Sequence, residues 1–302
     1  MYNLKKIDIH VHSASLPDPS VRLDGLNAYP TYEELRKIYD EMGIEKGVLM
    51  TLSSPEGVFR IVTNEEMCLL AKEHPDTYIW FCNIDPRHGK NMPDFDLVPL
   101  LEHYKRLGAK GVGEVTANLY FDDPYMYNLF SACEKCEMPL TFHIGIKGRS
   151  YGVVDDFGLP RLEKALQDFP NLKFLGHSQR FWSFISGDVT EENWGGYPKG
   201  AVTPGGRVIE LMEKYPNLYG DMSAGSGGNA FMRDPEFAYQ MIEKFQDRLL
   251  FGTDIANYEK PTNVAFNKFL DDAVESGKIS YEAYYKICRG NALKLLGIEG
   301  HL

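Results

Sequence analysis

The residues of this sequence that could do chemistry begin with a pair of histidines near the N-terminus. His10 and His12 lie in the stretch 6–12, in which apolar and polar residues alternate. Alternation with a period of two predicts a β-strand, so both imidazoles, with Asp8 behind them, should point to one face. Two neutral imidazoles held side by side suit a divalent metal such as zinc. The pair alone is a weak motif, because a surface strand can also carry two histidines on its polar face.

Further residues able to bind a metal or move a proton follow apolar runs later in the chain. They are Glu114, His143, His177 and Asp254. We expect His10, His12, His143 and Asp254 to hold one metal and to leave a position open for water. Asp254 could also accept a proton from that water, which a metal makes acidic. His177 could bind a second metal, polarise a substrate oxygen or orient the nucleophile.

The elements that must position these residues alternate between strand and helix along the whole chain. Strands are predicted over residues 6–12, 44–52, 77–84, 110–115, 139–144, 172–177, 218–222 and 248–253. Helices are predicted over residues 32–42, 63–73, 95–107, 124–137, 159–168, 208–214, 235–245 and 261–296, with loops over 13–30, 178–204 and 224–228. Strand–helix alternation predicts parallel strands with right-handed crossovers.

Eight such units predict an α/β fold, a (β/α)8 TIM barrel with extra C-terminal helices. A doubly wound open sheet is the alternative, but no Gly-x-Gly-x-x-Gly follows the first strand. We see no linker, so residues 1–302 are predicted to form a single domain. In a barrel of this kind chemistry lies at the carboxyl ends of the strands. The metal and proton-transfer candidates all stand at those ends, which strengthens the prediction of a metal site.

Composition limits the class of protein. The chain has 302 residues, 43% of them apolar, a net charge of −11 and a pI near 5.3. This acidity argues against nucleic acid or an anionic membrane as a partner. We find neither an apolar run of about 20 residues nor a signal-peptide pattern, and we expect a cytoplasmic protein. The five cysteines fit reduced thiols, and Cys133 and Cys136 have no second C-x-x-C pair to complete a zinc ribbon.

Four motifs in order carry a resemblance that covers nearly the whole chain. They are Asp8–His12, the strand with His143, Leu175–Ser178 and Phe251–Asp254. The sequence resembles the amidohydrolase superfamily, and within it the amidohydrolase-2 branch, which includes aminocarboxymuconate-semialdehyde decarboxylase, aromatic acid decarboxylases and lactonases. The resemblance implies a distorted (β/α)8 barrel and a divalent metal, zinc or manganese. It implies His10, His12, His143 and Asp254 as ligands, Asp254 as the general base and His177 as an active-site histidine.

One position departs from the simplest pattern of the superfamily. Many of its hydrolases bridge two metals with a carboxylated lysine from the fourth strand, whereas this chain offers Glu114. The position is similar to the strand-four glutamate of TatD-like hydrolases. A Glu114 that binds metal would make the site binuclear. We instead expect a single metal, with Glu114 as a hydrogen-bond partner of a ligating histidine or as a substrate contact.

Loops after the strands should rim the pocket. We expect substrate contacts from Arg180 and Arg149, which could clamp a carboxylate, and from Tyr120 and Trp182. The ordinary alternative is a solvated charge or a packed ring. An insertion between Trp182 and Trp194 is expected to act as a lid or as a contact in a homodimer.

The leading hypothesis is a metal-dependent hydrolase of a small cyclic ester or amide, such as a lactone, in which metal-activated water attacks the carbonyl. The nearest rival is a non-oxidative decarboxylase of an unsaturated or aromatic carboxylic acid that uses the same ligands. A third hypothesis is a non-enzymatic metal-binding or ligand-binding barrel. A complete ligand set beside a base favours the enzymes.

Overall fold

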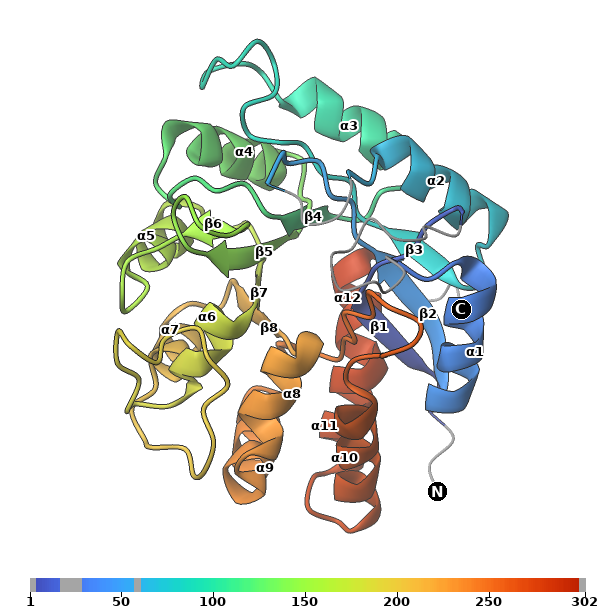
Figure 1. Ribbon diagram of the computed structural model, residues 1–302, viewed down its shortest axis with the longest axis vertical. Coiled ribbons are helices and arrows are strands. Elements are labelled where there is room, and N and C mark those ends of the chain that lie inside the picture. The colour runs from blue at the N-terminus through green and yellow to red at the C-terminus, as the bar shows by residue number, and fades with distance from the viewer. Residues whose placement is uncertain (1–3, 17–28, 57–60, 299–302) are drawn as a thin grey trace.

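The strands form a closed ring with helices around it, as Figure 1 shows. The computed structural model describes residues 4–16, 29–56 and 61–298. The barrel strands are β1 (Lys6–Val11), β2 (Ile44–Leu49), β3 (Tyr78–Trp80), β4 (Val112–Val115), β5 (Leu140–Gly145), β7 (Phe174–His177), β8 (Leu218–Asp221) and β9 (Leu249–Leu250). All pair in parallel with their neighbours. The predicted (β/α)8 barrel is confirmed, and a short extra strand, β6 (Val153–Val154), pairs with the end of β5.

Two seams close the ring where the strand ladders are interrupted. Cys82, just after β3, bridges in parallel to Val112 of β4. On the other side the Ile9 N–H donates to the Phe251 carbonyl at 3.0 Å, and the Asp254 N–H donates to the His10 carbonyl at 2.7 Å. The second seam therefore joins β1 to the end of β9 and places Asp254 directly beside His10.

The outer layer consists of helices that follow the strands. They are α1 (Tyr32–Met42), α2 (Asn64–Glu73), α3 (Val98–Arg106), α4 (Pro124–Lys135), α5 (Pro160–Asp168), α7 (Arg207–Lys214), α9 (Pro235–Lys244) and α10 (Val264–Glu275). Their ends follow the expected local chemistry. In α1, for example, the Glu34 carboxylate accepts the Thr31 N–H at 2.8 Å, and Gly43 ends the helix with a φ of 71°.

Three segments differ from the prediction. Residues 224–228, expected as a loop because of their glycines, begin the helix α8 (Ala224–Met232). A Cβ on Gly227 would lie 2.2 Å from the Met222 carbonyl, so close packing overrides the low helix propensity of glycine here. The C-terminal segment is not one helix: after α10 come α11 (Tyr281–Tyr285), a π-helical turn (Lys286–Gly290) and α12 (Asn291–Leu296). The long loop after β7 also contains α6 (Gln179–Trp182) and a 3-10 turn (Ser183–Ile185).

The core has two parts. The larger cluster lies between the strands and the surrounding helices, and a smaller one lies inside the barrel, where Ile7, Ile9 and Leu250 pack against Leu295 and Leu296 of α12. The π-helical turn and α12 also contact the first residues of the strands, since Asn291 donates to the Leu249 carbonyl at 2.8 Å. The last helix therefore covers the amino end of the barrel and leaves the carboxyl end to the functional residues.

The polar residues of β1 do not all share one face, contrary to the prediction. The pairing of β1 with β2 shifts register between Asp8 and Val11. Asp8 accepts the Tyr39 hydroxyl of α1 at 2.8 Å, whereas His10 and His12 face Asp254 and Glu114. A register shift rotates the strand between these residues, which is why simple alternation misplaces Asp8.

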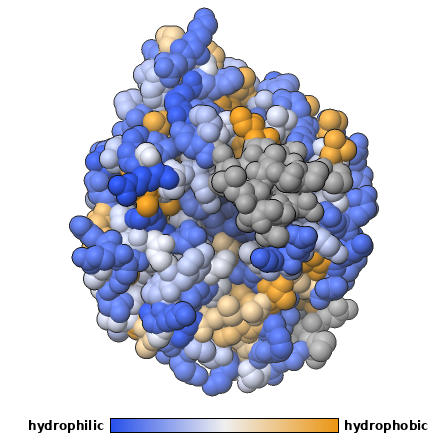
Figure 2. All heavy atoms as spheres, in the orientation of Figure 1, coloured by the Kyte–Doolittle hydropathy of each residue, from blue (hydrophilic) through white to orange (hydrophobic). Residues whose placement is uncertain are grey.

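None of the helices in the described parts of the chain is long and apolar enough to cross a membrane. On the face of the molecule in Figure 2, hydrophilic residues predominate and hydrophobic ones are scattered in small groups. Large apolar side chains are concentrated in the interior instead.

Candidate metal centre

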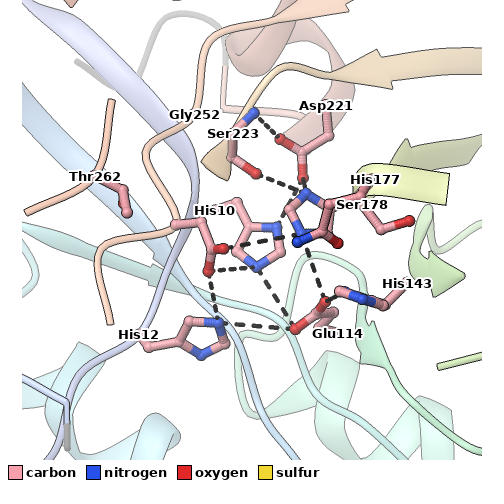
Figure 3. Close-up of polar contacts among 12 residues, drawn as sticks. His10, His12, Glu114, His143, His177, Ser178, Asp221, Ser223, Gly252 and Thr262 are labelled. Atoms are coloured by element: carbon pink, nitrogen blue, oxygen red, sulfur yellow. Dashed lines mark hydrogen bonds and ion pairs between the residues drawn. The ribbon is translucent and has the colours of Figure 1, made fainter. Parts of the chain in front are cut away.

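Side chains from different strands converge at the carboxyl end of the barrel (Figure 3). They are His10 from β1, Glu114 from β4, His143 from β5, His177 from β7 and Asp221 from β8. They are joined by His12, which directly follows β1, and by Asp254, four residues after the end of β9. All except Asp254 are buried. The sequence-predicted histidines and carboxylates therefore do meet in one place.

The pair His10 and His12 faces two carboxylates. Asp254 Oδ1 lies 3.1 Å from His12 Nε2 and 3.7 Å from His10 Nε2. Glu114 Oε2 lies 3.8 Å from Nε2 of each histidine. One ligand atom each from His10, His12 and Glu114 lies within 4.8 Å of the others.

The second oxygen of Glu114 faces a different pair of histidines. His143 Nδ1 donates to Glu114 Oε1 at 2.8 Å, and His177 Nε2 lies 3.7 Å from the same oxygen. These three residues form a separate group within 4.8 Å, which does not include His10 or His12. The carboxylate of Glu114 thus lies between both histidine pairs.

Two buried residues at the end of β8 contact the histidines from behind. His10 Nδ1 lies 2.7 Å from Asp221 Oδ2, and His177 Nδ1 lies 2.9 Å from the Ser223 hydroxyl. The indole N–H of Trp182 donates to the Asp221 carbonyl at 2.8 Å. Asp221 and Ser223 are not among the residues predicted from the sequence, although Asp221 lies at the carboxyl end of a predicted strand, as the predicted site residues do.

The electrostatics favour positive charge at the centre of the cluster. Burial alone would lower the pKa of His10, but Asp221, Asp254 and Glu114 together raise it to about 10. Burial would raise the pKa of Glu114 and Asp254, yet the surrounding histidines hold both pKa values below their usual range. Burial and the charge of His10 lower the pKa of His177 to about 4. The carboxylates are therefore ionised, and they stabilise either a proton on His10 or a cation in its place.

The residues fit a divalent metal. His10 Nε2 is buried and has no hydrogen-bond partner among the described residues, although it points at two carboxylates. Ligand atoms that each lie about 2.1 Å from a tetrahedral zinc ion are about 3.4 Å apart. The separations of 3.1, 3.7 and 3.8 Å between the nitrogens and carboxylate oxygens are near this value. An unpaired nitrogen surrounded by acceptors at these distances is what a missing cation would leave.

A buried network beneath the cluster holds β1 against the last strand. Asp8 Oδ1 accepts N–H groups from Thr253 at 2.8 Å and His10 at 3.0 Å. Its other oxygen accepts the hydroxyl groups of Thr253 and Tyr39. Gly47 makes room for this contact, because a Cβ there would lie 2.0 Å from the Tyr39 hydroxyl oxygen. The network aligns His10 with Asp254 on neighbouring strands.

The residues predicted to contact substrate differ in their burial and in their neighbours. Trp182 is 1% exposed and packs behind Asp221, not at the rim. Arg180 stacks over the Trp194 ring at 4.4 Å and has no carboxylate partner among the described residues. Tyr120 lies under Arg161 at 4.5 Å, and Arg149 is exposed in the loop after β5. Tyr151, another rim residue, packs its ring 4.4 Å from His143.

Comparison with solved structures agrees with the fold. An uncharacterised TIM-barrel protein from Bordetella bronchiseptica is 22% identical, with a TM-score of 0.64 over 97% of this chain and 99% of that one. The 5-carboxyvanillate decarboxylase of Sphingomonas paucimobilis is 17% identical, with a TM-score of 0.61 over 98% and 99%. A probable 2-pyrone-4,6-dicarboxylic acid hydrolase from Acinetobacter baumannii is 14% identical, with a TM-score of 0.55 over 98% and 100%. At these identities the likeness establishes the fold alone.

Comparison of the sequence itself is more specific. None of the curated proteins searched matches the chain significantly. The family model described as amidohydrolase, of the amidohydrolase-2 type, matches residues 7–298, which is nearly the whole chain. With its TIM barrel and its cluster of histidines and carboxylates at the carboxyl end of the strands, the chain belongs to the amidohydrolase-2 family.

Proposed function

We propose that the protein is a metal-dependent hydrolase of a small cyclic ester or amide, such as a lactone. The mixed nitrogen and oxygen donors of the cluster support zinc as the native metal, with manganese as the alternative. A bound divalent metal would supply a Lewis acid, which acidifies water and polarises a carbonyl oxygen. Side chains of the protein would transfer the proton and stabilise the oxyanion.

The observation that carries the proposal is the position of Asp254. Its side chain is 24% exposed, whereas those of His10, His177 and Glu114 are 0%, 2% and 6% exposed. Asp254 is therefore the carboxylate of the cluster that solvent can reach. Its lowered pKa keeps it ionised near neutral pH, despite the opposing effect of burial. Asp254 would accept the proton of the attacking water and release it toward solvent.

His177 would act on the substrate oxygen. Its Nε2 faces the cluster, 3.9 Å from Asp254 Oδ2, and its pKa of about 4 keeps the ring neutral near pH 7. A neutral imidazole with its proton on Nε2 would donate a hydrogen bond to the carbonyl oxygen as negative charge develops there. Asp254 would thus accept the proton, and His177 would donate a hydrogen bond to the developing oxyanion.

The cluster supports one metal at His10, His12 and Asp254, with an oxygen of Glu114 beside them. His143 holds the other oxygen of Glu114, so its direct ligation of the same metal stays a prediction. If a second metal binds, the group of Glu114, His143 and His177 is the place for it. We expect a single metal, because Glu114 Oε1 is already engaged by the His143 N–H.

The substrate is expected to be a small molecule, bound at the mouth in a cytoplasmic enzyme. Arg180 is the best placed of the predicted carboxylate contacts, since its guanidinium lacks a carboxylate partner among the described residues and it follows His177 by three positions. Arg149 and Tyr120 stay weaker candidates, because one is exposed and the other packs under Arg161.

The experiment is a substrate screen on metal-free protein reloaded with Zn²⁺ or Mn²⁺. Panels of lactones, cyclic amides and aromatic acids are followed by acid release, by amine formation and by carbon dioxide release. Acid release from a lactone, or amine formation from a cyclic amide, lost in the Asp254→Asn variant, is the expected result. Carbon dioxide release without acid release would instead favour the decarboxylase. Metal binding without turnover on any panel would favour a non-enzymatic metal-binding barrel.

A further inference from the structure

Asp221 and Ser223 lie two residues apart at the carboxyl end of β8. Each contacts the inner ring nitrogen, Nδ1, of a different histidine of the cluster, at 2.7 Å for His10 and at 2.9 Å for His177. Both residues are fully buried, and neither points its polar group at solvent. Solvent water therefore does not compete for the contacts that these two residues make with the histidine Nδ1 atoms.

The backbone already singles out Ser223. It occupies the N-cap position of α8, with φ −69° and ψ 174°, yet its hydroxyl makes no capping hydrogen bond. At the corresponding positions of α2 and α11, the hydroxyl groups of Thr63 and Ser280 do accept a helix N–H, at 3.2 and 3.1 Å. A capping serine usually stabilises its helix, because its hydroxyl satisfies a free backbone N–H of the first turn. The Ser223 hydroxyl contacts His177 instead of a helix N–H. Residues that break a local rule of helix capping in this way are typical of functional sites.

Asp221 determines which nitrogen of His10 carries the proton when the ring is neutral. Its ionised carboxylate can only accept, so Nδ1 of His10 must donate at 2.7 Å. The lone pair then lies on Nε2, which is the nitrogen that faces Asp254 and Glu114. Asp221 thus prepares His10 as a metal ligand.

Ser223 acts on His177 in the opposite sense. A proton on Nε2 of His177 faces two carboxylate oxygens, at 3.7 Å on Glu114 and 3.9 Å on Asp254. A proton on Nδ1 would face the Ser223 hydroxyl oxygen at 2.9 Å and Asp221 Oδ2 at 3.6 Å, an oxygen that already accepts from His10. It would also leave Nε2 without a proton opposite the two carboxylates, so the carboxylates favour the proton on Nε2. The Ser223 hydroxyl is then the donor to Nδ1, while the Ser223 N–H donates to Asp221 Oδ1 at 3.0 Å and fixes the two residues to each other.

We propose that Asp221 and Ser223 are positioning residues that impose opposite tautomers on His10 and His177. The centre of the cluster then receives a lone pair from His10 and an N–H from His177. One histidine is thereby prepared to bind a metal and the other to donate to a substrate oxygen. The inference rests on the proposed roles of these two histidines, but its test requires no turnover.

The test is nuclear magnetic resonance of the zinc-loaded protein with ¹⁵N-labelled histidine, which reports the protonated ring nitrogen of each histidine. In the wild type we expect the proton of His10 on Nδ1 and that of His177 on Nε2. Ser223→Ala should give a mixture of tautomers at His177 and leave His10 unchanged, and Ser223→Thr should restore the wild-type state. Asp221→Asn should lower zinc affinity about 10- to 100-fold, the usual effect of losing the acceptor behind a ligating histidine.

Ser280→Ala is the matched control, because it removes a serine from a true N-cap. It should lower the midpoint of thermal unfolding and leave both histidines and the zinc affinity unchanged. Ser223→Ala should instead change the tautomer of His177 and leave the midpoint of thermal unfolding close to that of the wild type. A proton on Nδ1 of His177 in the wild type would overturn the proposal, even if the variants fail to fold, because its Nε2 would then carry a lone pair instead of a donor. If the tautomers are as expected but no substrate is turned over, the proposed hydrolase fails and this inference stands.

Discussion

Nδ1 of His143 donates to Oε1 of Glu114 at 2.8 Å, and the other oxygen of Glu114 faces His10 and His12 at 3.8 Å. One carboxylate thereby connects strands β1, β4 and β5 of the barrel. Glu114 therefore lies at the middle of the cluster and not at its edge. Five predictions concern this arrangement and its surroundings.

Replacing Glu114 with Gln should weaken zinc binding about 10- to 100-fold. The amide has no negative charge to attract the cation, and its NH2 group cannot accept the His143 N–H. Competition with a chromogenic chelator measures the affinity. Glu163→Gln is the control, since Glu163 pairs with Lys214 and Arg207 away from the cluster, and its zinc affinity should equal that of the wild type.

Replacing His143 with Asn tests how this histidine acts. If His143 works by holding Glu114, the Glu114→Gln and His143→Asn effects on zinc affinity will be strongly non-additive in a double-mutant cycle. If it binds the metal independently, the two losses of binding free energy will add. Metal content by elemental analysis should give one ion per wild-type chain; two would contradict a single-metal site.

Replacing Asp254 with Asn should lower kcat about 10²- to 10⁴-fold at saturating metal, because an amide cannot accept the proton of the attacking water. The circular dichroism spectrum should not change, since the Asp254 backbone N–H bond to His10 is retained. Turnover as fast as that of the wild type would rule out Asp254 as the base.

Zinc binding to the metal-free protein should release close to one proton per ion from His10. Although burial opposes it, Asp221, Asp254 and Glu114 raise the pKa of His10 to about 10, so its ring is protonated at pH 8 until the metal displaces the proton. Affinity should therefore increase with pH, up to about tenfold per unit, until the pH approaches 10. Calorimetry in two buffers of different ionisation enthalpy counts the protons. The Asp221→Asn variant should release fewer protons. If it releases as many as the wild type, His10 is not their source.

Replacing Tyr39 with Phe should lower the free energy of unfolding by about 1–3 kcal/mol, because the buried Asp8 carboxylate loses a hydroxyl donor. Urea denaturation measures the change. Tyr125→Phe is the control, since its hydroxyl donates to the Asn91 carbonyl at the surface and its loss should have little effect. Equal stability of the two variants would mean that Asp8 is satisfied without Tyr39.

The sequence by itself determined the order of strands and helices, and it placed His10, His12, Glu114, His143, His177 and Asp254 at strand ends. These properties are local: periodicity, caps and stop residues are encoded within a few positions of each element. A parallel barrel then brings the carboxyl ends of all its strands to one mouth, so their convergence could be predicted without coordinates.

Only the tertiary structure decided which of these residues touch. The contact of His10 with Asp221 spans 211 positions, and that of Asp8 with Thr253 spans 245. The register shift in β1 turned Asp8 toward α1, and close packing made a helix of the glycine-rich segment after Ser223. Such outcomes depend on how distant surfaces fit together in three dimensions. A pattern that repeats every two or every 3.6 residues contains no record of that fit.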